Sequence, residues 1–316
     1  MQTLIIINNV AAKARKAWPV IEKQLQEAGL AYQVYETKAQ GDATEKTREA
    51  IRSGVNSIAV VGGDGTLSEV AEGFFEFNDD IDVVPKPLNR EVCLGVFPAG
   101  TGDDFARGLS GERLPLQHWI DKFLSLEQRA KHVDVLYGRC DGFHKPFICL
   151  NASTMGIGGE TAGRVAAQGK FMRNFSGEFR FLYAALGALA VWRERRVRVT
   201  VDGQTVADGP MNLVGVASGL YAGGGMMLSP DARNDDGKLD VVMASGLSRA
   251  NVITELSRVH QGGHVNNPKV NITRGEVVRI ETFLQKDGMP IEADGNVRGI
   301  TPVQFQVLPG ALKFVI

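Results

Sequence analysis

The N-terminal part of the chain alternates between strand-like and helical segments, and this alternation constrains the fold more than any other feature. The strand-like segments are LIIINN, AYQVYET, SIAVVGG and VCLGVFPAG, and each is followed by a segment with helical character. SIAVVGG is apolar throughout, as expected for a strand covered on both faces. Strands that alternate with helices predict an open, mostly parallel sheet with helices on both sides. Asp42 is predicted to cap the second helix.

The pattern changes near His132. Four later segments have strand character with little helix between them: KHVDVLYGRC, KPFICLNAST, RRVRVTVDGQTV and MNLVGVASG. Asp202-Gly203 in the third of them is typical of a tight hairpin turn. We therefore predict an α/β domain over residues 1–132 and a second, β-rich domain over residues 133–305.

Composition excludes some classes of function. The 316 residues carry a formal net charge of −1, which argues against a general nucleic-acid binder. The three cysteines form no spacing pattern, which indicates reduced thiols and a cytoplasmic protein. The N-terminus does not have the pattern of a signal peptide. The segment FLYAALGALAVW (181–192) is too short to span a bilayer and suits a buried helix or a helix lying in an interface.

The turn in VVGGDGT lies after a buried strand and before a helix, where open α/β sheets bind ligands. Gly62, Gly63 and Gly65 would let the backbone approach a phosphate group and offer amide donors to it. The helix that follows favours an anion at its N-terminus. Asp64 would repel a phosphate unless a cation or a hydroxyl proton lies between them, so it suggests phosphoryl transfer. The alternative is a tight turn in which Asp64 caps the next helix.

A second turn, in FPAGTGDDFAR, repeats this arrangement after the next strand. Gly100, Thr101 and Gly102 form the turn, and Asp103 and Asp104 begin a helix, where the helix dipole favours carboxylates. Capping alone would explain one of the two aspartates. Two such junctions at one sheet edge therefore favour a binding site.

The two turns together carry a family resemblance. GGDGTLSEV followed by PAGTGDDFAR resembles the diacylglycerol kinase catalytic domain, and the chain looks most like the bacterial lipid kinases of that family, which are related to sphingosine and ceramide kinases. NAD kinases share the first turn but not the second. The resemblance implies a nucleotide in a cleft between an α/β domain and a β-rich sandwich domain, with residues 306–316 returning to the first domain. It implies nucleotide contacts from Asn8, Thr37, Gly62, Gly63, Asp64, Gly65, Thr66, Glu69, Gly100 and Thr101.

The resemblance also implies a structural magnesium ion in the second domain. VASGLYAGGGMMLSPDARNDDGKLDVVM is similar to a family signature, in which the carbonyls of Arg233 and Lys238 and the carboxylate of Asp236 would be the ligands. Hard cations take such oxygen ligands. The alternative for NDDGK is an ordinary hairpin turn.

The sequence departs from the family at three places. NNVAAKAR keeps Asn8 but lacks the family's Pro and Gly, and Asp103 stands where Asn is usual. The family's Asp-Gly-Glu motif, whose Glu is the proposed general base, is Asp294-Gly295-Asn296 here. Asn cannot accept that proton. We expect an active kinase that uses Asp294 or a neighbouring carboxylate such as Glu292, with Asp64 and Asp104 organising the catalytic magnesium. The alternative is an inactive homologue.

Residues 160–198 have the composition of a membrane-facing segment. They contain eight basic and three acidic residues, a local charge of +5, interleaved with phenylalanines: Arg164, Lys170, Arg173, Arg180, Arg193, Arg195, Arg196 and Arg198; Glu160, Glu178 and Glu194; Phe171, Phe175, Phe179 and Phe181. Basic and aromatic residues beside a helix suit peripheral docking on an anionic membrane. A solvated loop with a core-facing helix is the alternative.

We therefore predict an ATP- and Mg²⁺-dependent lipid kinase that phosphorylates diacylglycerol or a related lipid such as a ceramide or sphingoid base. Its expected partner is lipid at the membrane surface, and a homodimer is possible. A kinase for a soluble acceptor such as NAD, and a non-catalytic lipid- or nucleotide-binding homologue, stay open as alternatives.

Overall fold

The computed structural model describes residues 2–78, 83–125, 130–142, 145–169, 172, 175 and 177–316. The chain divides into two compact units. Unit 1 comprises Met1–Val135 and Pro309–Ile316, and unit 2 comprises Leu136–Leu308.

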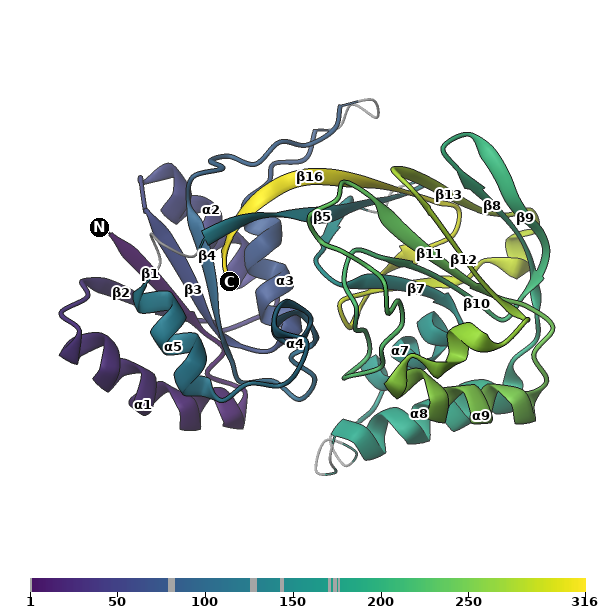
Figure 1. Cartoon of the computed structure of the whole chain (residues 1–316), viewed down its shortest axis with the longest axis horizontal. Helices are drawn as coiled ribbons and strands as arrows, with labels where there is room; N and C mark the ends of the chain where they lie inside the picture. Colours follow the sequence, from purple (N-terminus) through teal and green to yellow (C-terminus); the bar gives the residue numbers. More distant parts are fainter. Residues whose placement is uncertain are drawn as a thin grey trace. The chain divides into compact units, whose positions relative to one another are not determined.

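Unit 1 is built on a parallel sheet. Its strands follow the order β2 (Tyr32–Glu36), β1 (Thr3–Ile7), β3 (Ser57–Gly62), β4 (Cys93–Pro98) and the end of β16 (Val303–Val315). The helices are α1 (Ala12–Glu27), α2 (Asp42–Arg52), α3 (Asp64–Gly73), α4 (Asp104–Ser110) and α5 (Leu116–Leu124). Helices α1 and α5 pack together, as do α2 and α3 (Figure 1). The predicted open α/β architecture is confirmed.

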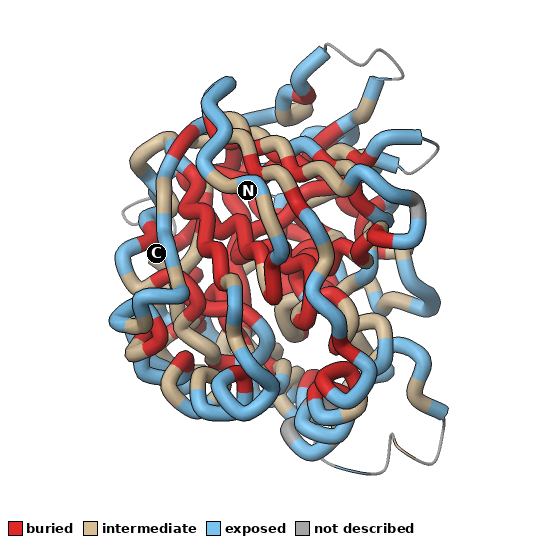
Figure 2. Tube along the Cα trace, turned by 90° about the vertical axis from the view of Figure 1, so that its right-hand side faces the viewer, coloured by how far each residue is buried: buried red, intermediate tan, exposed pale blue. Residues whose placement is uncertain are grey.

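Burial explains why these segments form strands. All six residues of β3 are buried, as are all five of β1, because helices cover both faces of the sheet. Figure 2 shows the buried positions concentrated in strands and on the inner sides of helices. The edge strand β2, by contrast, has no buried residue; Tyr32 and Tyr35 are half-buried and its other positions are exposed.

Unit 2 is rich in antiparallel strands arranged in two sheets. One contains β15 (Asn296–Ile300), β14 (Pro290–Ala293), β7 (Ala152–Gly156), β10 (Leu213–Ala217), β11 (Leu239–Ala244) and β12 (Val270–Gly275). The other sheet contributes these strands to unit 2: β9 (Gln204–Met211), β8 (Arg195–Val201), β13 (Val277–Thr282), the start of β16, β6 (Phe147–Cys149) and the end of β5 (Ala130–Cys140). One apolar cluster joins residues of both sheets, including Val199, Ile280, Met155 and Val241. Two sheets over a shared core form the predicted sandwich.

Among its described residues, unit 2 contains the helices α7 (Ile157–Ala166), α8 (Gly177–Val191) and α9 (Arg249–Arg258) and the short 3₁₀ helices η2 (Val259–Gln261), η3 (Gly263–Asn266) and η4 (Gln285–Asp287). Within the described part of the chain, no helix is both long and apolar enough to cross a membrane.

Two local predictions, a hairpin and a helix cap, have different outcomes. The hairpin at Asp202-Gly203 is confirmed, with positive φ at both residues between β8 and β9. The prediction that Asp42 caps α2 is wrong, because Gly41 occupies the cap position with φ of 90°. The Asp42 carboxylate instead accepts hydrogen bonds from the backbone of Lys38 and Ala39, which precede the helix.

Candidate functional site

The carboxyl ends of the parallel strands in unit 1 bring most of the predicted nucleotide residues together. Asn8 follows β1 and donates its backbone N–H to Val61 of β3, and Thr37 follows β2 and donates to Ile7 of β1. Ala99, after β4, donates its N–H to Gly62 at 2.9 Å. The strand ends are therefore joined at one edge, which is where open parallel sheets bind ligands.

The two glycine turns touch each other through their backbones. A side chain on Gly63 would place its Cβ 2.9 Å from the Cα of Gly100, and one on Gly100 would lie 2.6 Å from the Cα of Gly63. Such distances are below any normal contact, so both positions require glycine. The close approach leaves unsubstituted backbone at the start of α3, which suits an anionic ligand.

Asp64 connects the first turn to the second. Its Oδ2 accepts the backbone N–H of Asp104 and its Oδ1 that of Phe105, both at 3.0 Å. Asp64 therefore caps α4, forty residues further along the chain, whereas the alternative from sequence placed it as the cap of the adjacent helix. In that helix, α3, the N-cap residue is Gly63, and no side chain caps the helix. The bonds place the half-buried Asp64 beside Asp104, whose side chain is buried.

Thr66 and Glu69 of α3 form hydrogen bonds with the segments that follow the first two strands. The Asn8 side-chain amide donates to the Thr66 hydroxyl at 3.0 Å, and the Gly41 N–H donates to the Glu69 carboxylate at 3.1 Å. The segment after β1 thus joins the first turn even without the family's Pro and Gly. Gly65 lies in the first turn of α3, and Thr101 is exposed in the second glycine turn.

Sequence reasoning missed two cations at the second turn. Lys13 on α1 donates its Nζ to the Gly100 carbonyl at 2.9 Å, and Arg113 contacts the same carbonyl at 3.4 Å. No motif signalled them, because they lie 87 and 13 residues from Gly100 in the chain. Because Arg113 also pairs with Asp103, Lys13 is the cation whose charge increases the attraction of this turn for phosphate.

Asp103 explains the departure from the family's Asn. It adopts the left-handed conformation with φ of 51°, which Asn and Asp tolerate best among residues with a side chain. Its carboxylate accepts the Gly100 N–H at 2.7 Å and pairs with Arg113 at 2.7 Å. Asn could keep the first bond, whereas only Asp gives the charge that pairs with Arg113.

Asp294 in unit 2 is buried in a tight turn between β14 and β15. Its Oδ2 accepts the N–H of Leu150 at 2.7 Å and its Oδ1 that of Asn151 at 3.0 Å. An ionised carboxylate has about four acceptor sites, and the Cys149 side chain also bonds to Asp294, so an acceptor site remains for a substrate hydroxyl. Asn296 is half-buried at the start of β15, two residues beyond this turn.

Glu292, the other carboxylate considered from sequence, is also buried. It accepts the Thr154 hydroxyl and the N–H of Gly295, both at 2.6 Å. These bonds tie β14 to β7 and to the turn that carries Asp294. The turn is thus held at both of its acidic residues.

One of the predicted magnesium ligands in unit 2, Asp236, is bonded to an arginine, Arg274. Asp236 accepts the Lys238 N–H at 3.1 Å on Oδ1 and the Arg274 guanidinium at 2.6 Å on Oδ2. Arg233, the other residue predicted to ligate through its carbonyl, pairs its side chain with Asp235. A guanidinium at this distance repels a divalent cation, so this set of residues does not fit magnesium while Arg274 stays in place.

Counterions neutralise much of the charge predicted for residues 160–198. Arg193 pairs with Asp287, Arg195 with Glu160, and both Arg196 and Arg198 with Asp208. Two of these partners lie outside the segment, which is why the sequence count overstated its free charge. Lys170, Phe171 and Arg173, and the side chains of Glu178 and Phe181, lie outside the described residues.

Helix α8 exposes a row of apolar side chains. Phe179, Leu182, Tyr183 and Leu186 are 47%, 53%, 61% and 48% exposed, and they are spaced as one face of a helix. The opposite face, with Ala184, Ala185 and Ala188, is buried in unit 2. The helix is thus apolar on both sides. Its buried face agrees with the alternative of a buried helix, and its position in an interface stays a prediction.

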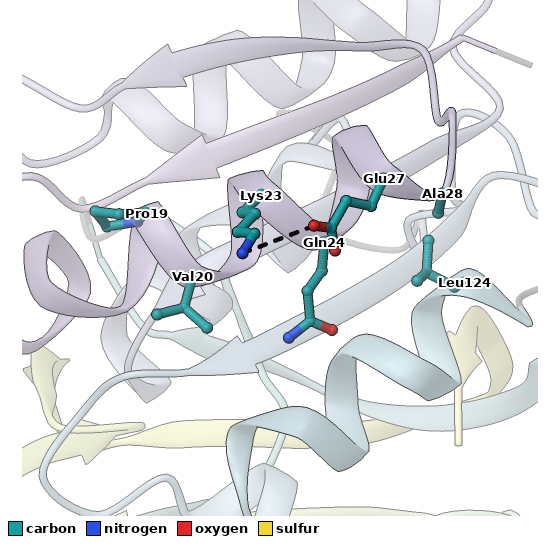
Figure 3. Close-up of a pocket in the computed structure, with 7 residues that line it drawn as sticks. All are labelled: Pro19, Val20, Lys23, Gln24, Glu27, Ala28 and Leu124. Atoms are coloured by element: carbon teal, nitrogen blue, oxygen red, sulfur yellow. Dashed lines mark ion pairs between the residues drawn. The ribbon is translucent and has the colours of Figure 1, made fainter.

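A hollow elsewhere in unit 1 contains none of the predicted residues. It has a volume of about 670 Å³ and is lined by Pro19, Val20, Lys23, Gln24, Glu27, Ala28 and Leu124 (Figure 3). These residues belong to the last part of α1 and the end of α5, away from the glycine turns at the start of α3 and α4. We do not assign it a role in catalysis.

Comparison with known proteins identifies the family. Residues 2–137 match the diacylglycerol kinase catalytic domain, and residues 155–316 match the YegS C-terminal NAD kinase beta sandwich-like domain. The chain is 31% identical over 240 residues to a "Probable lipid kinase YegS-like" of Xanthomonas campestris pv. campestris (strain 8004), covering 76% of this chain and 72% of the relative. It is 27% identical over 303 residues to a diacylglycerol kinase of Staphylococcus carnosus (strain TM300), covering 95% and 90%.

Solved structures show the same fold. The crystal structure of a diacylglycerol kinase from Bacillus anthracis str. Sterne superposes with a TM-score of 0.67 at 22% identity, covering 99% of this chain and 96% of that one. Yeast NADH kinase superposes with a TM-score of 0.50 at 11% identity. One fold therefore serves kinases with different acceptors, and the acceptor has to be argued from the site.

Proposed function

The chain belongs to the diacylglycerol kinase family of lipid kinases, and we propose that it transfers the γ-phosphoryl group of ATP to a hydroxyl group of diacylglycerol or a related lipid. The observation that carries this proposal is the backbone contact between Gly63 and Gly100, with Asp64 bonded across it to the start of α4. Phosphoryl transfer depends mainly on positioning and on stabilisation of charge. Two joined glycine turns with Lys13 beside them supply both.

In this proposal the phosphates of ATP lie against the two turns, and Asn8, Thr37, Thr66, Glu69 and Thr101 frame the nucleotide. Asp64 and Asp104 would hold the magnesium ion that accompanies ATP, since they lie together and offer the oxygen ligands that magnesium prefers. When bound, the ion neutralises charge on the β- and γ-phosphates.

Asp294 is the proposed partner of the acceptor hydroxyl. Its two backbone hydrogen bonds fix the orientation of the carboxylate, and its remaining acceptor sites suit a hydroxyl donor. Glu292 holds the same turn and takes the supporting role. Asn296, in the position of the family's Glu, favours one competing proposal, that of a homologue that binds substrates without turnover.

Peripheral binding to a lipid surface follows from the proposed substrate. The exposed row on α8 offers apolar contact, with Arg164 exposed on the neighbouring helix α7. Because most arginines of the segment are paired with carboxylates, we assign the larger contribution to apolar insertion rather than to charge.

The test is transfer of labelled γ-phosphate from ATP with Mg²⁺ into mixed micelles that contain diacylglycerol, monoacylglycerol, ceramide or sphingosine, with NAD as a soluble acceptor. Label in diacylglycerol or another of these lipids supports the proposal and identifies the acceptor. Label in NAD alone would replace it with a soluble-acceptor kinase. Binding of ATP with no label in any acceptor would favour the non-catalytic homologue.

A further inference from the structure

Arg274 on β12 contacts two aspartates of the segment in which a structural magnesium ion is implied. Its Nη2 donates to Asp236 at 2.6 Å, and its Nε lies 3.2 Å from Oδ1 of Asp240. Asp240 and Arg274 are also direct cross-strand partners in the pairing of β11 with β12. One guanidinium therefore ties the turn over residues 233–238 to the sheet.

The chemistry of arginine suits this bridging position. Its guanidinium is always charged, is planar, and presents several N–H donors in a rigid fork that can reach two carboxylates at once. Both oxygens of Asp236 are already bonded, Oδ1 to the Lys238 N–H and Oδ2 to the Arg274 guanidinium. The positive guanidinium opposes a magnesium ion, which requires near-ideal octahedral oxygen ligands at about 2.1 Å.

Burial makes a counterion necessary here. The Asp240 side chain is 2% exposed, and its Oδ1 lies 3.2 Å from the Nε of Arg274. A buried carboxylate without a partner is strongly destabilising. Removal of Arg274 would therefore leave a vacant, negatively charged site.

We propose that Arg274 is the built-in counterion of Asp236 and Asp240 and stands in place of the divalent cation that the family resemblance implies in this turn. It follows that unit 2 folds without bound magnesium, and that any magnesium requirement of the enzyme arises at the nucleotide.

The first test is thermal unfolding of the full chain without nucleotide, in Mg²⁺ and in EDTA. We expect the wild-type Tm to be the same in both. R274Q should lower the Tm in EDTA by roughly 5–15 °C, and Mg²⁺ should restore about 5 °C at a concentration of 100 times its Kd, because the vacated carboxylates can then bind the cation.

The matched control is R279Q. Arg279 makes a bidentate pair with Asp141 elsewhere in unit 2, at 2.8 and 2.6 Å. Its loss should lower the Tm equally in Mg²⁺ and in EDTA. A wild-type protein that loses stability in EDTA, or an R274Q variant as stable as wild type, would overturn the proposal.

Electron paramagnetic resonance of Mn²⁺ gives a second readout that does not depend on activity. Without nucleotide, the wild type and R274K, which keeps the positive charge, should show no tight Mn²⁺ site, whereas R274Q should gain one and R274Q/D236N should lose it again. If R274Q fails to fold, the wild type and R274K still test the proposal. A tight Mn²⁺ site in either of them would contradict the role of Arg274 as the counterion.

Discussion

At the scale of single residues, the proposed nucleotide site depends on positions that tolerate no side chain. Gly63 and Gly100 are in backbone contact, and a Cβ on Gly100 would also lie 2.6 Å from the Asp103 carboxylate. That carboxylate already accepts the Gly100 N–H, so it cannot move away without losing a hydrogen bond. Both turns can therefore adopt this geometry only because Gly63 and Gly100 have no side chain.

Gly100→Ala should separate the two turns. We expect a loss of stability of about 1–3 kcal/mol from overpacking, and weaker ATP binding by at least tenfold. Chemical denaturation and calorimetric titration with ATP measure the two effects. The control is Gly108→Ala in α4, where a Cβ meets nothing within 4 Å and helix propensity predicts a gain of about 0.5–1 kcal/mol. Unchanged ATP affinity in folded Gly100→Ala would argue against phosphate binding at these turns.

Asp294→Asn should lower kcat by about 10²-fold or more, because a carboxylate at the acceptor hydroxyl is replaced by a group that cannot take its proton. The amide would also lose one of the two backbone bonds. Asp202→Asn is the matched control, since Asp202 also has positive φ and accepts two backbone N–H groups, those of Glu276 and Val277. Both of those bonds go to Oδ1, which Asn keeps, so Asp202→Asn should leave kcat unchanged.

Asn296→Glu complements this variant by restoring the family's residue. If the carboxylate at position 296 acts as a base elsewhere in the family, kcat should rise, with ATP affinity unchanged. Wild-type turnover in Asp294→Asn, together with no gain in Asn296→Glu, would remove this turn from the mechanism.

His264 makes stability depend on pH. It is buried in η3, where burial lowers its pKa below the usual 6.5, although a hydrogen bond to the Leu228 carbonyl opposes this. Between the folded and unfolded pKa values the unfolded chain binds more protons, so stability rises with pH there. The contribution of His264 is therefore complete above about pH 6.5 and is lost as pH falls below it. His264→Gln should flatten the fall in urea midpoint between pH 7.5 and 5.5, and an unchanged slope would contradict this.

At the scale of elements, α8 has an unusual distribution of apolar residues. Its inner face packs in unit 2, while its outer face keeps large side chains about half exposed. An exposed apolar row of this size commonly marks an interaction surface. The pattern of FLYAALGALAVW could not show which side chains remain exposed, because both faces are apolar.

Leu182→Glu/Leu186→Glu should weaken binding to phosphatidylcholine vesicles by tenfold or more, since burial of a leucine contributes about 1.5–3 kcal/mol. Vesicle flotation measures the change, with Val20→Glu/Leu124→Glu in the hollow of Figure 3 as the control. Binding should depend only weakly on added phosphatidylglycerol. If the variant binds vesicles normally but changes from dimer to monomer in light scattering, the row is a subunit interface instead.

At the scale of the whole molecule, the last strand belongs to both units. The first part of β16 pairs with β13 in unit 2, and its end pairs with β4 in unit 1 through Lys313 and Phe314. Phe314 is fully buried, with its ring 4.8 Å from that of Phe105 on α4. The C-terminal residues thus support the helix that begins at the second glycine turn.

Phe314→Ala should destabilise the protein by about 3–5 kcal/mol and weaken ATP binding, because the cavity lies beneath α4. Leu284→Ala, at an exposed position in unit 2, should change stability by less than about 0.5 kcal/mol. Denaturant unfolding followed by ATP titration separates the two effects. Full stability in Phe314→Ala would show that unit 1 does not need the end of β16.

The sequence by itself determined the architecture of both units and the place of the two glycine turns. Strand and helix periodicity, and glycine at turns, reflect interactions between neighbours in the chain, which a sequence displays directly. Helices α5, α7 and α9 were not predicted, because each has only 9 or 10 residues, which gives a periodic pattern few turns in which to repeat.

Only the tertiary structure decided what the polar side chains do. Asp64 reaches α4 across 40 residues, Lys13 reaches Gly100 across 87, and Arg274 reaches Asp236 across 38. A motif can suggest a cation beside Asp236 but cannot show that an arginine from the neighbouring strand supplies it. Charge and hydrogen bonding act through space, so the partner of each group depends on the folded chain.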